Sequence, residues 1–195
     1  MKRAFDILFS LLVLLLLLPL LFVLGVIVAT TSTGGAFFRQ VRVGKDAREF
    51  RLLKFRTMRP ASEALGQITV GARDPRITGV GGWLRKTKCD ELPQFWNVLV
   101  GDMSVVGPRP EVPKYVALYS QDQRRILRVR PGITGPASLE YIDENALLGR
   151  SADPERTYIE EVMPAKLAMD LRYVERASVV SDLGILLATV GKLFR

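Results

Sequence analysis

The chain has 195 residues, with 28 Lys and Arg against 20 Asp and Glu, for a formal net charge of +8. It contains no histidine, which excludes Ser-His-Asp triads and zinc sites built on histidine. Its single cysteine, Cys89, excludes an intramolecular disulfide and any site with several cysteine ligands. A metal ion would therefore be held by oxygen, which favours magnesium-like ions. The charge predicts an anionic partner: a phosphate, a nucleic acid or a lipid headgroup.

Residues 7–29 form an apolar run without a charge. A helix rises about 1.5 Å per residue, so this run is long enough to cross a hydrocarbon core of about 30 Å, and it is too long for a signal peptide. We therefore predict membrane association. Pro19 lies in the middle of the run and predicts a kink, because proline removes a backbone hydrogen bond and clashes with the preceding turn.

Both flanks of the apolar run are basic, and the positive-inside rule places each of them in the cytoplasm. A helix that bends at Pro19 and returns to the same face satisfies both flanks. A tilted spanning helix that tolerates the proline is the alternative, and sequence physics alone favours it, because kinked spanning helices are common. The flanking cations are Lys2 and Arg3 on one side and Arg39, Arg42 and Lys45 on the other.

The rest of the chain predicts a mixture of strands and short helices. Residues 37–58 alternate loosely around Gly44–Asp46 and predict two strands joined by a tight turn. Residues 60–75 are small and polar and predict a mobile surface loop. Helices are expected around Trp83–Arg85 after Gly81-Gly82, from Asp90 to about Val100 with Gly101 ending it, from Lys114 to Val129, and from Asp153 until Pro164 breaks it or starts another. A turn-rich connector is expected over residues 130–136.

The last helix is expected to begin near Ser181-Asp182. Its apolar residues recur at helical spacing, which fits a helix lying on the membrane surface and, equally, a helix packed against a protein core. The stripe consists of Leu183, Leu186, Leu187, Val190, Leu193 and Phe194.

The acidic pair Asp90-Glu91 is the first candidate for chemistry. Arg85, Lys86 and Lys88 precede it and would attract phosphate while keeping the carboxylates ionised. A carboxylate placed there is able to attack phosphorus, and its neighbour is able to ligate magnesium. Acids at helix starts are also ordinary caps, and taken alone the pair favours that interpretation.

Three further groups are candidates. Pro108 and Pro110 stiffen the backbone around Arg109, which suits a bidentate phosphate contact or simply a rigid turn with a solvated Arg. Alternation puts Lys54 and Arg56 on one strand face and Phe55 on the other, which makes either a phosphate-facing edge or a solvated face. Asp170 is either a metal ligand or a helix-surface acid, and the sequence leaves both open.

Several ordered motifs resemble the bacterial sugar transferase family, the small monotopic phosphoglycosyl transferases. The resemblance runs from about Lys2 to about Thr189, over nearly the whole chain. The motifs that carry it are, in order, Phe55–Met58, Asp90–Gln94, Asn97–Leu99, Gly101–Ser104, Gly107–Pro110 and Arg130–Gly135.

The resemblance implies transfer of a sugar-1-phosphate from a UDP-sugar to polyprenyl phosphate, with release of UMP. It implies a covalent phosphosugar intermediate on Asp90, with Glu91 as its metal-associated partner, and a requirement for Mg2+. By motif match, Arg85 binds phosphate, and Pro108, Arg109 and Pro110 help to hold the nucleotide. The sequence after Gly135 departs from the family pattern at residues 136–140, which leaves the choice of sugar open.

The resemblance also implies the architecture. We expect an α+β fold with a re-entrant membrane helix over residues 1–35, broken at Pro19, and a catalytic domain over residues 36–195 with amphipathic helices at the interface. The expected location is the bacterial inner membrane, with the catalytic domain on the cytoplasmic face. An oligomer is compatible with this architecture.

Rival interpretations are a catalytically silent scaffold or binding protein of the same fold, and a phosphatase that uses water as acceptor. The charge supports nucleic-acid binding weakly, and no recognisable nucleic-acid module accompanies it. The intact set Arg85, Asp90, Glu91 and Arg109 argues against a silent member.

Overall fold

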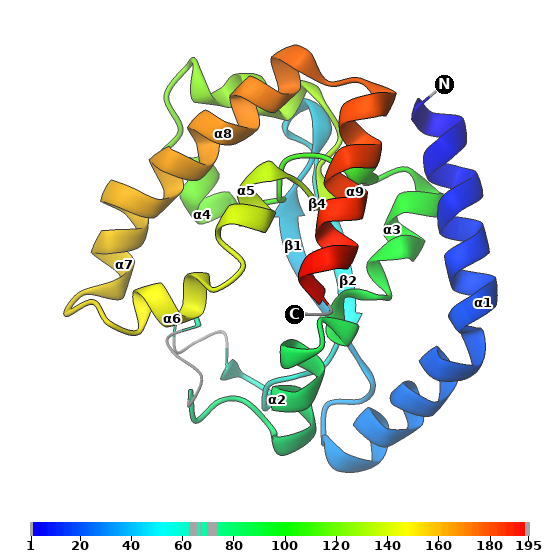
Figure 1. The fold of residues 1–195 in the computed structure, drawn as a ribbon. Coiled ribbons are helices and arrows are strands. Elements are labelled where there is room, and N and C mark those ends of the chain that lie inside the picture. The colour runs from blue at the N-terminus through cyan, green and yellow to red at the C-terminus, as the bar shows by residue number, and fades with distance from the viewer. Residues whose placement is uncertain (1, 63–65, 67, 70–73, 194–195) are drawn as a thin grey trace.

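The computed structural model describes residues 2–62, 66, 68–69 and 74–193, and it shows a mixed α and β fold, as expected (Figure 1). Its strands are β1 (Phe37–Val43), β2 (Glu49–Phe55), β3 (Ser104–Val106) and β4 (Gly132–Thr134). Its α-helices are α1 (Lys2–Thr31), α2 (Gly79–Lys86), α3 (Gln94–Val100), α4 (Pro113–Val116), α5 (Pro136–Glu140), α6 (Glu144–Leu148), α7 (Pro154–Thr157), α8 (Met163–Arg176) and α9 (Val179–Leu193). Short helical turns occupy Lys45–Ala47, Cys89–Glu91, Gln123–Arg128 and Tyr158–Val162.

The helix α1 is long and apolar enough to cross a membrane by length and composition. It spans 30 residues with Pro19 inside, and its most apolar window has a mean hydropathy of 3.3 and is only 11% buried. The core helix of a soluble protein would be mostly buried, so this exposure favours contact with lipid. Figure 1 shows α1 curving along one edge of the molecule.

The first turns of α1 are fixed to the rest of the chain by polar contacts. Lys2 forms an ion pair with Asp182 of α9. Arg3 donates to the carbonyl oxygens of Val98 and Leu99 at the end of α3, at 2.6 and 2.9 Å. Asp6 is buried, and its Oδ1 accepts at 3.0 Å from the Ser104 hydroxyl and from the Val105 amide.

The far end of α1 packs on the same unit through apolar contacts. Leu24 and Val28 lie in a cluster with Phe55 of β2 and Leu84 of α2, and both of these partners are fully buried. Both ends of the apolar helix therefore contact one folded body.

The two predicted strands pair as an antiparallel hairpin, which confirms that expectation. The register runs from Phe37 opposite Phe55 to Val43 opposite Glu49. A second pair, β3 and β4, is parallel, with Ser104 opposite Gly132 and Val106 opposite Thr134. The second strand of that pair lies inside the segment expected to be only a turn-rich connector.

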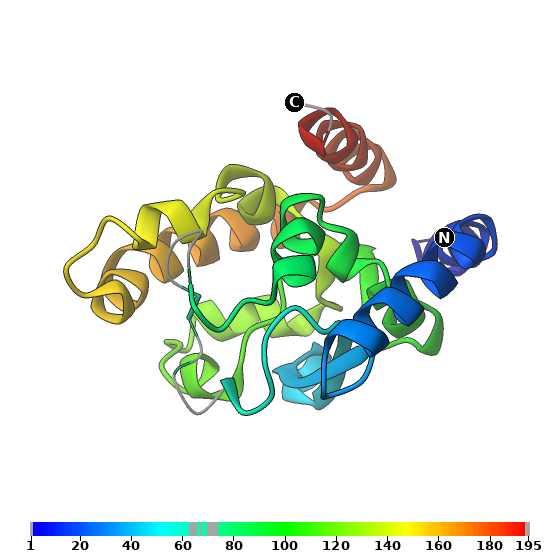
Figure 2. The same cartoon turned by 90° about the horizontal axis from the view of Figure 1, so that it is seen from below.

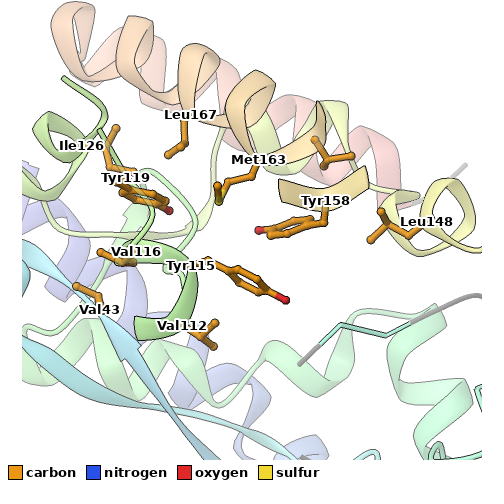
Figure 3. Close-up of a cluster of buried hydrophobic side chains, with 11 residues drawn as sticks. Val43, Val112, Tyr115, Val116, Tyr119, Ile126, Leu148, Tyr158, Met163 and Leu167 are labelled. Atoms are coloured by element: carbon orange, nitrogen blue, oxygen red, sulfur yellow. The ribbon is translucent and has the colours of Figure 1, made fainter. Parts of the chain in front are cut away.

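The main core lies between the hairpin and α8 (Figure 3). The rings of Tyr115 and Tyr158 meet there with centroids 5.0 Å apart. The predicted single helix over residues 114–129 is wrong, because the segment divides into α4 and the turn Gln123–Arg128. The Ser120 amide donates to Gln123 Oε1 at 2.8 Å and the Gln123 amide donates to Ser120 Oγ at 3.2 Å, so these two residues start a new helical turn.

The C-terminal helices follow the predicted starts closely. Asp153 caps α7 by accepting from the Arg156 amide at 3.0 Å, and α8 begins at Met163 with Pro164 in its first turn. In α9, Leu186 packs on a buried cluster, whereas Leu183, Leu187 and Val190 are exposed. The helix therefore presents apolar side chains both to the core and to the outside. The side chains of Leu193 and Phe194 lie outside the described residues.

Candidate active site

The pair Asp90-Glu91 sits on the short helical turn Cys89–Glu91, immediately before α3. Lys88 starts this turn in the left-handed conformation, with φ of 57°, and its carbonyl accepts from the Glu91 amide at 3.2 Å. The expectation that the pair opens the α-helix needs correction, since α3 begins at Gln94 after Pro93. The tight turn brings both carboxylates into one cavity, which adjacent residues of a regular helix, about 100° apart, do not readily achieve.

This cavity, of about 230 Å³, lies between the hairpin, α2 and the acidic pair. Cationic side chains dominate its walls, so it suits an anionic ligand. Its cations are Arg42, Lys54, Arg76, Arg85, Lys88, Arg109 and Lys166. Described parts of the segment 60–75 also line it, among them Ser62, Gly66, Ile68 and Thr69; residues 63–65, 67 and 70–73 of the predicted mobile loop lie outside the described residues.

Glu91 and Arg109 form a forked ion pair beside Asp90. Arg109 Nη2 donates to Glu91 Oε1 at 2.6 Å, and Nη1 donates to Oε2 at 3.4 Å. Burial by itself raises the pKa of Glu91, but the charge and hydrogen bond of Arg109, with Lys88 and Lys54, lower that pKa to about 2. Glu91 is therefore ionised throughout the neutral range.

Asp90 is buried, with 6% of its surface exposed. Burial, followed by the charge of Glu91, raises the pKa of Asp90 to about 6, against the opposing effect of Lys54, Arg85 and Lys88. Lys54 shares this environment, because burial and the nearby charges of Arg42 and Arg85 lower its pKa to about 8. At neutral pH the cavity therefore holds a carboxylate and an ammonium group, each within about one pH unit of its own titration.

The helix α2 places Arg85 against Thr57, just after the end of β2. Its N-cap, Thr78, accepts from the Gly81 amide at 3.0 Å. A Cβ at Gly81 would meet the Thr57 carbonyl oxygen at 2.1 Å, so only glycine allows this approach. Arg85 Nε then donates to Thr57 Oγ1 at 2.9 Å, and its Nη1 donates to Thr69 Oγ1 at 3.2 Å.

The loop that carries Arg109 is bonded to β4. The Gly107 amide donates to the Thr134 carbonyl at 2.9 Å, and the Gly132 amide donates to the Pro108 carbonyl at 2.8 Å. These bonds and the two prolines fix the backbone on both sides of Arg109.

The structure brings most of the predicted site residues together. Asp90, Glu91, Arg85, Lys54, Arg109 and Pro110 all line the cavity. Two predicted residues, Arg56 and Pro108, do not line it. Arg56 donates to the Gly35 and Phe37 carbonyls at 3.1 and 2.9 Å, and Pro108 lies near Val43 and Pro131.

Asp170 is buried in α8, close to the Arg109 loop and α5. Burial raises its pKa to about 7, against the lowering effect of the Ala137 backbone amide, Lys166 and the Arg109 backbone amide. It is therefore neither an exposed acid nor a residue of the cavity wall.

Sequence reasoning missed three linked residues of the cavity wall, Arg42, Glu111 and Tyr158. Arg42 Nη1 donates to Glu111 Oε1 at 3.1 Å, and the Tyr158 hydroxyl donates to Glu111 Oε2. Burial lowers the pKa of Arg42, opposed by the charge of Glu111. The available signal was strand alternation, since Arg42 lies on the same face of β1 as Phe38, and Phe38 pairs with Lys54 of β2.

The comparisons with known proteins identify the family of this chain. The model of the bacterial sugar transferase family matches residues 1–195. A UDP-glucose:undecaprenyl-phosphate glucose-1-phosphate transferase of Klebsiella pneumoniae is 41% identical over 196 residues, which cover 99% of this chain and 40% of that protein. A UDP-N-acetylgalactosamine-undecaprenyl-phosphate N-acetylgalactosaminephosphotransferase of Aeromonas hydrophila is 38% identical, over 97% of this chain and 42% of that protein.

A shorter relative matches almost end to end. The exopolysaccharide production protein PSS of Rhizobium leguminosarum bv. phaseoli is 38% identical over 197 residues, which cover 97% of this chain and 93% of that protein. The chain thus spans about two fifths of the length of the first two relatives and nearly all of the third. With a match over the full chain and relatives above 30% identity, the chain belongs to the bacterial sugar transferase family.

Proposed function

We propose that this chain transfers a sugar-1-phosphate from a UDP-sugar to polyprenyl phosphate, such as undecaprenyl phosphate, and releases UMP as the first membrane step of a glycan assembly pathway. The observation that carries the proposal is a buried carboxylate, Asp90, held in a cation-lined cavity beside the Glu91–Arg109 pair. The activities for which the Klebsiella and Aeromonas relatives are named support the same reaction class.

In the first step, an oxygen of the Asp90 carboxylate attacks the phosphorus that bears the sugar. The new O–P bond forms a phosphosugar on Asp90, and the bond from that phosphorus to the bridging oxygen breaks. UMP leaves with the electron pair. Lys54, Arg85 and Lys88 surround Asp90 and are placed to neutralise the charge on the leaving phosphate.

In the second step, a phosphate oxygen of the polyprenyl phosphate attacks the same phosphorus. The bond to Asp90 breaks and restores the carboxylate, and the product is a sugar joined to the polyprenol through a diphosphate. The ionised Glu91 stays paired with Arg109, so the guanidinium remains aimed at the reaction centre.

The donor set suits Mg2+. Among the described residues no group of three or more Asp, Glu or Cys is placed to hold a metal ion, so Asp90 and Glu91 offer a pair of carboxylates and not a larger cluster. Mg2+ commonly takes one or two carboxylates together with substrate phosphates and water, which fits this pair. When bound, the ion would neutralise diphosphate charge.

We further propose that α1 is re-entrant and that the catalytic cavity lies on the cytoplasmic face. The contacts of Lys2, Arg3 and Asp6 at one end and of Leu24 and Val28 at the other support this topology. A helix whose two ends bind one water-exposed domain has both ends on the same side of the membrane.

The test is UMP release from a panel of UDP-sugars by purified protein with Mg2+ and undecaprenyl phosphate. The relatives differ in sugar, so the panel includes UDP-glucose and UDP-N-acetylgalactosamine. We expect release with a donor in the panel, dependent on the acceptor and lost on chelation of the metal. Release in the absence of acceptor, beyond one equivalent of enzyme, would instead indicate a hydrolase. Donor binding without release would favour the silent scaffold of the same fold.

A further inference from the structure

A second cavity, of about 300 Å³, opens beside the catalytic one, between α1 and α9. Figure 2 shows these two helices at the same side of the molecule, well apart from one another. The walls are Phe9 and Val13 of α1 and Leu186 and Val190 of α9, and the floor includes Phe95 of α3 and Ile133 of β4. The volume is at the low end of the range for small-molecule sites, about 300–1,000 Å³.

Direct bonds hold α9 over the floor of this groove. The Thr134 and Thr189 hydroxyls are 2.8 Å apart, and Lys192 Nζ donates to the Leu139 carbonyl at 2.5 Å. On the other wall, the ring of Phe9 contacts that of Phe95, with centroids 6.2 Å apart. The groove is therefore built by contacts within the chain, and its apolar walls continue into the exposed apolar residues of both helices, such as Leu16 and Leu187.

The inner end of the groove is charged, unlike its walls. Lys88, Glu91 and Arg109 line both this groove and the catalytic cavity. A smaller cavity of about 120 Å³ shares Lys88 and Arg109 with both of them, and it shares Ser138 with the groove. An apolar channel that ends at two cations and one carboxylate, with a net positive charge, complements an amphiphile with an anionic head.

Ser138 adds a polar group at the same end. Its hydroxyl oxygen is buried and has no hydrogen-bond partner among the described residues. Buried hydroxyls are normally bonded, since an unmade bond costs free energy, so this oxygen is suited to a ligand. Ser138 lines both the groove and the smaller cavity of about 120 Å³.

We infer that this groove binds the phosphate-proximal isoprene units of the polyprenyl phosphate acceptor, with its phosphate at Lys88, Arg109 and the Ser138 hydroxyl. The inference rests on the proposed function, and it names where the second substrate enters and which residues hold it. The remainder of the chain would lie along the exposed apolar faces of α1 and α9, in the lipid.

The experiment tests binding of the isoprene chain of the acceptor and binding of its phosphate separately. Val190→Trp fills the groove from the exposed side of α9, and Val180→Trp is the matched control, because Val180 is 82% exposed on the same helix and does not line the groove. We expect Val190→Trp to raise the KM for undecaprenyl phosphate about tenfold and to leave the KM for the UDP-sugar unchanged. Val180→Trp should change neither. With dimethylallyl phosphate, whose chain is a single isoprene unit, Val190→Trp should lose most of its effect.

Ser138→Ala tests the phosphate end. Loss of one hydrogen bond to a charged group should raise the KM for both acceptors about tenfold, again without an effect on the donor. An unchanged acceptor KM in Val190→Trp would overturn the inference.

A readout independent of turnover separates failure of the groove from failure of the proposed function. An undecaprenyl phosphate analogue with a diazirine on its second isoprene unit should label peptides that contain residues 186–190 in the unmodified protein and not in Val190→Trp. Labelling without UMP release from any donor would refute the proposed reaction and retain the groove. Release without this labelling would retain the reaction and refute the groove.

Discussion

Asp90 and Lys54 set opposite limits on the pH range in which the donor can react. In the proposed reaction Asp90 attacks as an anion, so kcat/KM for the UDP-sugar should fall as the pH falls through the Asp90 pKa of about 6. Lys54 attracts the diphosphate as a cation, so kcat/KM should fall as the pH rises through the Lys54 pKa of about 8. We predict a bell-shaped profile with a loss of about tenfold per pH unit beyond each limit.

Two substitutions at Lys54 assign the two limbs. Lys54→Arg keeps a charge that persists above pH 8, so the alkaline limb should disappear. Lys54→Met removes a cation that lowers the Asp90 pKa, so the acid limb should move to higher pH. Lys86→Met is the control: Lys86 is exposed on α2 and does not line the cavity, and both limbs should remain.

The assay is initial UMP release at low donor concentration, from about pH 5 to about pH 9. In a double displacement, kcat/KM for the donor contains only the first step, so titration of the acceptor phosphate does not enter. An alkaline limb that stays near pH 8 in Lys54→Arg would refute the role given to Lys54.

Three further predictions test the site and the membrane helix. Asp90→Asn should lower turnover about a thousandfold or more, while the thermal unfolding midpoint of the detergent-solubilised protein stays unchanged. Near-normal turnover would contradict the role of Asp90 as the nucleophile. Arg109→Lys cannot reproduce the forked bond to Glu91, so kcat/KM for the donor should fall about tenfold to a hundredfold, and an unchanged value would show that the fork is dispensable. In a Cys89→Ser background, a cysteine at residue 2 should react with reagent from the cytoplasmic side only. Pro19→Leu should move that labelling to the opposite side, and unchanged labelling would refute the kink as the cause of the topology.

The elements that could be predicted from the sequence are those set by local pattern. The hairpin follows from alternation around a turn, α1 from an uninterrupted apolar run, and the end of α3 from Gly101, which adopts φ of 100°. The acidic pair and its cations were also identified, because they are close in sequence or carry the family resemblance. Asp170 stayed undecided, because its burial depends on packing against the segments that contain Arg109 and Ala137.

The features that could not be predicted depend on contacts between distant segments. The parallel pairing of β3 with β4 joins two three-residue strands, each too short to show a period. The pairing is possible because Gly107 and Gly132 bring two backbones closer than any side chain allows: a Cβ on Gly132 would meet the Gly107 amide nitrogen at 2.1 Å. The same pairing fixes the Arg109 loop, so an important part of the site follows from glycines that carry no chemistry.

The overlap of the two cavities is what the proposed double displacement requires. If each step proceeds in line, the acceptor oxygen attacks the phosphosugar opposite Asp90, from the position that the UMP phosphate has left. The acceptor phosphate must then occupy the leaving-group site, while its isoprene chain stays outside the polar cavity. Lys88 and Arg109 line both cavities, whereas Asp90 lines the polar one, which is the arrangement that this geometry needs. UMP should therefore inhibit competitively against undecaprenyl phosphate. Ser138→Ala should weaken the binding of the acceptor and leave the binding of UMP unchanged. Equal loss of both would place Ser138 in the nucleotide site instead.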